Sequence, residues 1–112
     1  MLILMLILGH SMGGALAQIS AAYYSHLNPW LVSLAAPSVG NQWFCNHIDN
    51  YVQPYGGLRV WNEYDLVPFI ALLVGYSHAG IPIKMRVQRE ARELFLSESI
   101  NTVVTLSSSL SL

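Results

Sequence analysis

The chain has 112 residues, which is enough for one small domain but not for two of ordinary size. Apolar residues make up 54% of the sequence and charged residues only 10%, a composition that argues against a disordered chain or a coiled coil. The formal net charge of −1 gives no electrostatic basis for binding nucleic acid. Because a chain of this length buries only about two thirds of its unfolded surface, we expect exposed apolar surface unless a partner covers it.

The first segment, residues 1–8, is an uninterrupted apolar run that ends at Gly9. Such a run is typical of a strand buried on both faces of a parallel sheet, and it is far shorter than the roughly 20 residues of a membrane-spanning helix. A secretory signal is the alternative, because Ala15-Leu16-Ala17 fits a cleavage site. The basic residues that open such signals are missing, since the first basic side chain is Arg59.

Helical and extended patterns alternate along the next part of the chain. Apolar residues at steps of three and four predict helices, and short apolar runs closed by Pro or Gly predict strands. In chain order the sequence predicts a helix from Met12 to Leu27, a strand over 30–36, a helix capped by Asn41 that reaches Val52, a turn over 54–57 and a strand over 58–64.

This order indicates βαβ units, so we expect an α/β fold with a mainly parallel sheet of three to four strands and flanking helices. Residues 81–87 predict a fourth strand, which Pro82 restricts to an edge or a strand start. A short helix is predicted from Val87 onward. Residues 1–96 are therefore expected to form a partial domain, and the Ser/Leu-rich residues 97–112 a poorly ordered tail.

One pentapeptide carries the pattern of a nucleophilic serine. Gly9-His10-Ser11-Met12-Gly13 fits G-x-S-x-G and lies between a predicted strand and a predicted helix, the context that this motif requires. In such an elbow the serine occupies a strained turn, and the flanking glycines allow the strand and helix to approach closely. The N–H of Met12 is then placed to stabilise an oxyanion. The alternative is a Gly-Ser-Gly turn that only connects two elements.

Asp65 is the best candidate for the acid that supports this serine. It follows the third predicted strand, so in a parallel sheet it lies at the same edge as Ser11. Glu63 and Asp49 lie inside predicted elements, and the other glutamates fall in the predicted C-terminal helix. The alternative is that Asp65 only closes a turn before Val67-Pro68.

Four histidines are candidates for the general base. His10 directly precedes the serine, and its side chain points away because adjacent side chains diverge, whereas His26 and His47 lie within predicted helices. His78 is left as the candidate, and the chain between it and Asp65 is long enough to bring the two together. The resulting order of serine, aspartate and histidine is that of the α/β-hydrolases.

Four stretches in order resemble the fungal-type, class 3 lipase family of α/β-hydrolases. GHSMGGALAQ resembles the family's elbow GHSLGGALA, and SLAAPSVGNQWF resembles its FGxPRVGNxxF segment. RVWNEYDLVPFI resembles its strand and D-x-V-P loop, and GYSHAG its YxHxG. The resemblance covers roughly residues 1–83, and four motifs in the right order are far more specific than one. It also argues against a cleavable leader.

The resemblance implies a partial α/β-hydrolase that cleaves esters of acylglycerols or related lipids, with Ser11 as nucleophile and Asp65 as acid. In the family the base lies further downstream than the histidine that corresponds to His78, and this chain has no later histidine. The family's first oxyanion donor and lid precede the elbow strand, and Ser38 stands where the family has arginine. The alternative function is therefore a catalytically incompetent fragment or interaction module.

The sequence also indicates possible partners of the chain. An exposed sheet edge predicts self-association. Contact with a lipid surface is a second hypothesis, with an ordinary solvated helix as its alternative. No cofactor or metal is expected, because histidines and carboxylates do not cluster at ligand spacing and Cys45 is the single cysteine. The lipid-surface hypothesis rests on residues 84–96, where Lys84, Arg86, Arg89 and Arg92 accompany Met85, Val87, Leu94 and Phe95.

Overall fold

The computed structural model describes residues 4–86 and 96–105. Its centre is a sheet of four parallel strands in the order β1-β2-β3-β4, which confirms the predicted α/β class. Among the described strands β4 pairs only with β3, as expected for a strand that contains Pro82. The strands are β1 (Leu6–His10), β2 (Trp30–Leu34), β3 (Gln53–Asn62) and β4 (Ile81–Met85).

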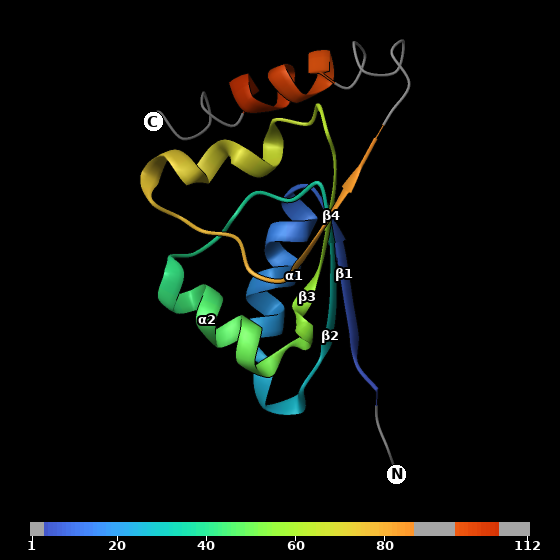
Figure 1. Ribbon diagram of the computed structural model, residues 1–112, viewed down its shortest axis with the longest axis vertical. Helices are drawn as coiled ribbons and strands as arrows, with labels where there is room; N and C mark the ends of the chain where they lie inside the picture. The colour runs from blue at the N-terminus through green and yellow to red at the C-terminus, as the bar shows by residue number, and fades with distance from the viewer. Residues whose placement is uncertain (1–3, 87–95, 106–112) are drawn as a thin grey trace.

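Two α-helices, α1 (Met12–Tyr23) and α2 (Gln42–Tyr51), cover the same face of the sheet (Figure 1). The side chain of Asn41 accepts a hydrogen bond of 3.0 Å from the N–H of Phe44, so the predicted cap of α2 is confirmed. Two 3₁₀ helices, η1 (Ser25–Leu27) and η2 (Val67–Val74), complete the named elements. None of the helices in the described part of the chain is long and apolar enough to cross a membrane.

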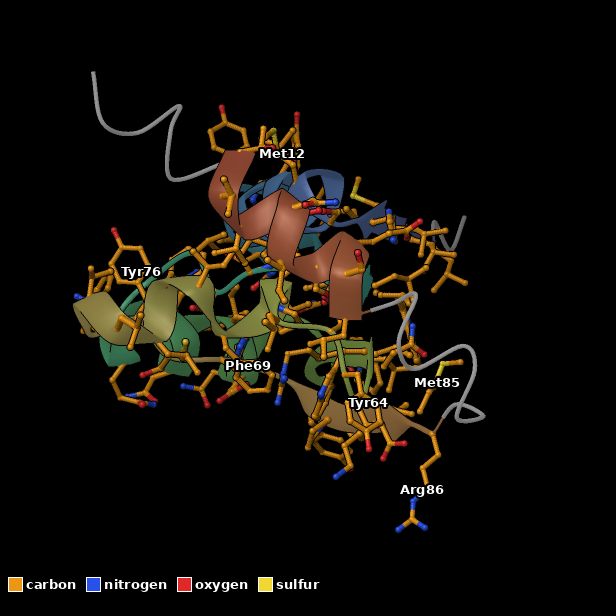
Figure 2. All side chains as sticks on the ribbon, turned by 90° about the horizontal axis from the view of Figure 1, so that it is seen from above. Met12, Tyr64, Phe69, Tyr76, Met85 and Arg86 are labelled. Carbon is orange, nitrogen blue, oxygen red and sulfur yellow. The ribbon has the colours of Figure 1, made fainter. Side chains whose placement is uncertain are left out.

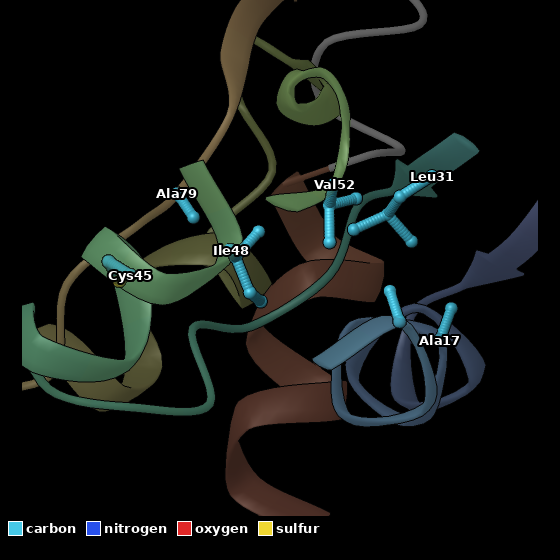
Figure 3. Close-up of a cluster of buried hydrophobic side chains, with 7 residues drawn as sticks. Ala17, Leu31, Cys45, Ile48, Val52 and Ala79 are labelled. Carbon is cyan, nitrogen blue, oxygen red and sulfur yellow. The ribbon is translucent and has the colours of Figure 1, made fainter. Parts of the chain in front are cut away.

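The core lies between the two helices and the sheet. Small residues of α1 pack against Leu31 of β2, while Ile48 of α2 is completely buried (Figure 3). The alanines in α1 let the helix lie close to the strands, because a methyl group needs little space between two backbones. This packing fixes α1 relative to β1 and therefore fixes the bend that joins them. The cluster consists of Ala17, Ala21, Leu31, Cys45, Ile48, Val52 and Ala79.

Several boundaries differ from the prediction, and β2 and β3 each end two residues earlier than expected. β1 extends to His10 rather than Leu8, because Gly9 and His10 still pair with the end of β2. The first helix stops at Tyr23 and continues as η1. The predicted turn over 54–57 lies within β3, where Tyr55 and both following glycines have positive φ. Each difference concerns where an element begins or ends, and the predicted order of the elements is correct.

The largest difference concerns the C-terminal segment, which we expected to be poorly ordered. Residues 96–105 form a helix that lies with η2 above the carboxyl ends of the strands (Figure 1). Thr102 and Thr105 donate side-chain hydrogen bonds of 2.9 Å to the carbonyls of Glu98 and Asn101, one helical turn earlier. The hydroxyl-rich sequence is therefore compatible with a helix. The short helix predicted from Val87 and most of the proposed lipid-surface segment lie outside the described residues.

Candidate active site

Ser11 lies in the bend between β1 and α1, where the motif predicts a nucleophile. Its backbone has φ 55° and ψ −121°, a conformation that non-glycine residues rarely adopt and that stores strain. The Ser11 N–H donates a hydrogen bond of 2.8 Å to the carbonyl of Leu34, the last residue of β2. The serine is thus fixed at the carboxyl end of the sheet, immediately before the amino end of α1.

Two glycines, Gly9 and Gly14, make this bend possible. Gly9 belongs to the G-x-S-x-G motif, whereas Gly14 follows the motif. A Cβ on Gly9 would lie 2.0 Å from the carbonyl oxygen of Gly13, and a Cβ on Gly14 would lie 2.6 Å from the Cβ of Ala36. A Cβ on Gly13 would meet no described atom within 4 Å beyond its chain neighbours and the backbone of its own helix. The close approach of strand and helix therefore requires glycine at positions 9 and 14. At position 13 only the backbone takes part in the contact, and a Cβ there has room.

Met12 is the first residue of α1, so its N–H has no carbonyl one turn earlier in the helix to bond with. This N–H lies next to Ser11 at the positive end of the helix dipole. The predicted role of Met12 as an oxyanion donor depends on this backbone group, since its side chain is largely exposed (Figure 2). The position matches the prediction, and the role stays a prediction.

Ser11 and Asp65 line the same pocket, which has a volume of about 140 Å³. The pocket opens at the carboxyl ends of β1, β2 and β3, the edge at which the sequence places both residues. Side chains from the 96–105 helix form part of its wall, and Figure 2 looks down onto this edge of the molecule. The lining residues are His10, Ser11, Ala35, Asn62, Asp65, Val67, Glu98, Ser99 and Thr102.

The Asp65 carboxylate is buried and held by two donors. Its Oδ1 accepts a hydrogen bond of 3.0 Å from the N–H of Val67 and one of 2.7 Å from the hydroxyl of Ser99. The first contact closes the turn after β3, so the turn-closing interpretation of Asp65 and the acid interpretation are both compatible with its geometry. The second contact joins the carboxylate to the 96–105 helix.

The structure does not bring His78 into this pocket. The Nε2–H of His78 donates to the carbonyl of Pro68 at the start of η2, and its Nδ1 is buried with no partner among the described residues. Burial lowers the pKa of His78, the nearby Arg59 charge lowers it further, and the hydrogen bond with Pro68 acts in the opposite direction. His78 is therefore held near η2, apart from the residues that line the pocket, in surroundings that favour the neutral imidazole.

The sequence reasoning missed the contribution of the 96–105 helix to the site. The hydroxyl of Ser99 donates a hydrogen bond to Asp65, and Glu98 lines the pocket. The spacing of Leu96, Ile100 and Val104 at steps of four was the available signal for a helix. Within residues 4–86 and 96–105 no group of three or more His, Cys, Asp or Glu side chains is arranged to hold a metal ion.

A strained serine between a parallel strand and a helix, with an aspartate at the same sheet edge, defines a partial α/β-hydrolase. The family model described as Lipase (class 3) matches residues 3–75. The chain belongs to the class 3 lipase family. A comparison with curated proteins gives no significant match.

Solved structures of fungal lipases are similar to this chain. The Lip2 lipase of Yarrowia lipolytica is 25% identical with a TM-score of 0.63, and the match covers 72% of this chain and 32% of that one. For the lipase of Rhizopus microsporus var. chinensis the identity is 26%, the TM-score 0.62 and the coverage 71% and 30%. For the triacylglyceride lipase of Rhizomucor miehei the values are 29%, 0.51, 70% and 32%. The chain therefore spans about a third of the length of these lipases.

Proposed function

We propose that the protein hydrolyses esters of acylglycerols or related lipids, with Ser11 as the nucleophile. The observation that carries this proposal is the shared pocket of Ser11 and Asp65 at the carboxyl edge of the sheet. Membership of the class 3 lipase family, and similarity to a lipase described as acting on triacylglycerides, support the lipid ester as substrate.

In the proposed reaction the Ser11 hydroxyl gives its proton to a general base while its oxygen attacks the ester carbonyl carbon. The negative charge that develops on the carbonyl oxygen is stabilised by the Met12 N–H at the start of α1. The carbon–oxygen bond to the alcohol then breaks, the alcohol takes the proton from the base, and an acyl group stays on Ser11. Water releases this acyl group in a second attack of the same kind.

Asp65 is the proposed acid that orients the base and stabilises its charged form. Its burial and its two hydrogen bonds hold the carboxylate in one position, which favours such a role. His78 stays our predicted base. To reach Ser11 it has to release the Pro68 carbonyl and move from η2 toward the pocket.

Hydrolysis of a short-chain p-nitrophenyl ester by the full chain tests this proposal. We expect Ser11→Ala to reduce the rate to that of the buffer, because the attacking hydroxyl is lost. The matched control is Ser38→Ala, a buried serine that does not line the pocket, which should leave the rate unchanged. Hydrolysis that survives Ser11→Ala would overturn the proposal. His78→Ala tests the base separately, and an unchanged rate in this variant would assign the base to another group.

A further inference from the structure

The Asp65 carboxylate receives one hydrogen bond from a nearby residue and one from a distant part of the chain. Val67 follows Asp65 by two residues, so its N–H is placed by the turn after β3. Ser99 follows Asp65 by 34 residues, and its hydroxyl donates to the same Oδ1 atom at 2.7 Å. An O–H donor at this distance from an ionised carboxylate makes a strong, charge-assisted hydrogen bond. The 96–105 helix therefore contributes one of the two hydrogen bonds described for this carboxylate.

The orientation of the 96–105 helix places a polar side chain toward the pocket. Ser99 is only 5% exposed and lines the pocket, whereas Ile100 and Val104 of the same helix are 47% and 59% exposed. The apolar side of a helix usually faces the protein interior. Burying a hydroxyl is unfavourable unless it is hydrogen-bonded, and Asp65 accepts that bond. The helix thus directs Ser99 inward in spite of the apolar character of Ile100 and Val104.

Both hydrogen bonds end on one oxygen of the carboxylate. The Val67 N–H and the Ser99 hydroxyl donate to Oδ1, and among the described residues no hydrogen bond reaches Oδ2. The Cβ–Cγ torsion of an aspartate is broad and nearly two-fold, so a single donor does not prevent the two oxygens from exchanging places. Two donors from different elements restrict this rotation, and they leave Oδ2 as the oxygen that is available to a general base.

We propose that Ser99 is a positioning residue for ester hydrolysis, and that its hydroxyl holds Oδ1 of Asp65 so that Oδ2 accepts the N–H of the general base. This inference rests on the proposed function, since it assigns Ser99 a role in the reaction of Ser11. The base is oriented only if its acceptor stays in one place, and a misplacement of about 1 Å can cost on the order of 100-fold in rate. Ser99 exchanges no proton with the ester and acts through Asp65.

Steady-state hydrolysis of a short-chain p-nitrophenyl ester by the full chain tests this role. We expect Ser99→Ala to lower kcat by about tenfold to 100-fold and to change KM by less than about twofold, because the hydroxyl acts on the acid and not on the bound ester. Ser99→Thr keeps the hydroxyl, so its kcat should stay within about threefold of that of the parent chain. The matched control is Ser38→Ala, which removes a hydroxyl that is equally buried but lies outside the pocket lining, and it should leave kcat unchanged.

Urea unfolding measures the contact between Ser99 and Asp65 without reference to hydrolysis. Ser99→Ala should lower the unfolding midpoint of the parent chain, because a hydrogen bond to a charged group is lost. In an Asp65→Ala chain the Ser99 hydroxyl has lost this acceptor, so the further change Ser99→Ala should leave the midpoint unchanged or raise it. Far-ultraviolet circular dichroism checks that every variant is folded. Equal losses of stability in the two backgrounds would overturn the assigned contact.

The pattern of rates separates a failure of this inference from a failure of the proposed function. If the parent chain hydrolyses the ester and Ser11→Ala does not, but Ser99→Ala keeps the parent kcat, then Ser99 has no positioning role and the proposed function stands. A parent chain without hydrolysis contradicts both. A faster Ser99→Ala would show that the hydroxyl competes with the base, and a higher KM at unchanged kcat would show that Ser99 only lines the pocket. Either result would overturn the inference, as would equal losses of kcat in Ser99→Ala and Ser99→Thr.

Discussion

Replacing Asp65 by asparagine is expected to lower ester hydrolysis by about 10⁴-fold while the free energy of unfolding changes little. The asparagine Oδ1 still accepts the hydrogen bonds of the Val67 N–H and the Ser99 hydroxyl, so the turn after β3 and the contact with the 96–105 helix are retained. The negative charge that stabilises a protonated base is lost. Steady-state hydrolysis and urea unfolding, measured on the same preparation, separate the two effects.

Asp65→Ala is the companion variant, and it should lose both ester hydrolysis and stability against urea. It leaves two buried donors without an acceptor, at about 1–3 kcal/mol each, so we expect about 3 kcal/mol of destabilisation in addition to the loss of hydrolysis. If Asp65→Asn retains full activity, Asp65 serves only to close the turn. If instead Asp65→Asn is as unstable as Asp65→Ala, the two hydrogen bonds do not explain the burial of this carboxylate.

Gly9→Ala is expected to destabilise the protein by about 3 kcal/mol, the upper range for forcing an extra carbon into a packed site. The new Cβ would lie 2.0 Å from the Gly13 carbonyl oxygen, and a backbone atom cannot move aside as a flexible side chain can. Either α1 shifts away from β1 or the bend at Ser11 opens. Thermal or urea unfolding measures the loss of stability.

Gly13→Ala provides the control for this prediction within the same motif. Its Cβ would meet no described atom within 4 Å beyond its chain neighbours and the backbone of its own helix, and alanine is favoured over glycine within a helix by roughly 0.5–1 kcal/mol. We therefore expect Gly13→Ala to be as stable as the parent chain or slightly more stable. If the two substitutions destabilise the protein equally, the close contact at Gly9 and the free space at Gly13 do not explain which glycine the bend requires.

The fold could be predicted from local patterns because its order is set by short apolar runs and by residues with strong local preferences. Asn41 is an example, since a capping side chain needs only the helix that follows it. The bend at Ser11 could be predicted for the same reason, because the motif includes both of the elements that it joins. The need for glycine at position 14 could not be predicted in this way. It arises from close contact with Ala36, which lies far along the chain.

The site could be predicted only as far as sheet topology determines it. Ser11 and Asp65 share a pocket because the carboxyl ends of parallel strands meet at one edge. The contact of Ser99 with Asp65 joins segments 34 residues apart and depends on how the 96–105 helix packs, which periodicity does not specify. The bond of His78 to the Pro68 carbonyl likewise depends on the course of η2, which chain length alone left open.

Covalent labelling with a fluorophosphonate probe, followed by peptide mapping of the folded chain, measures whether Ser11 is an activated nucleophile. Such a probe forms a bond only with a serine hydroxyl that is activated by its surroundings. We expect one added probe on the peptide that contains Ser11, and no label in Ser11→Ala. A folded chain that stays unlabelled, or one labelled at another serine, would contradict it.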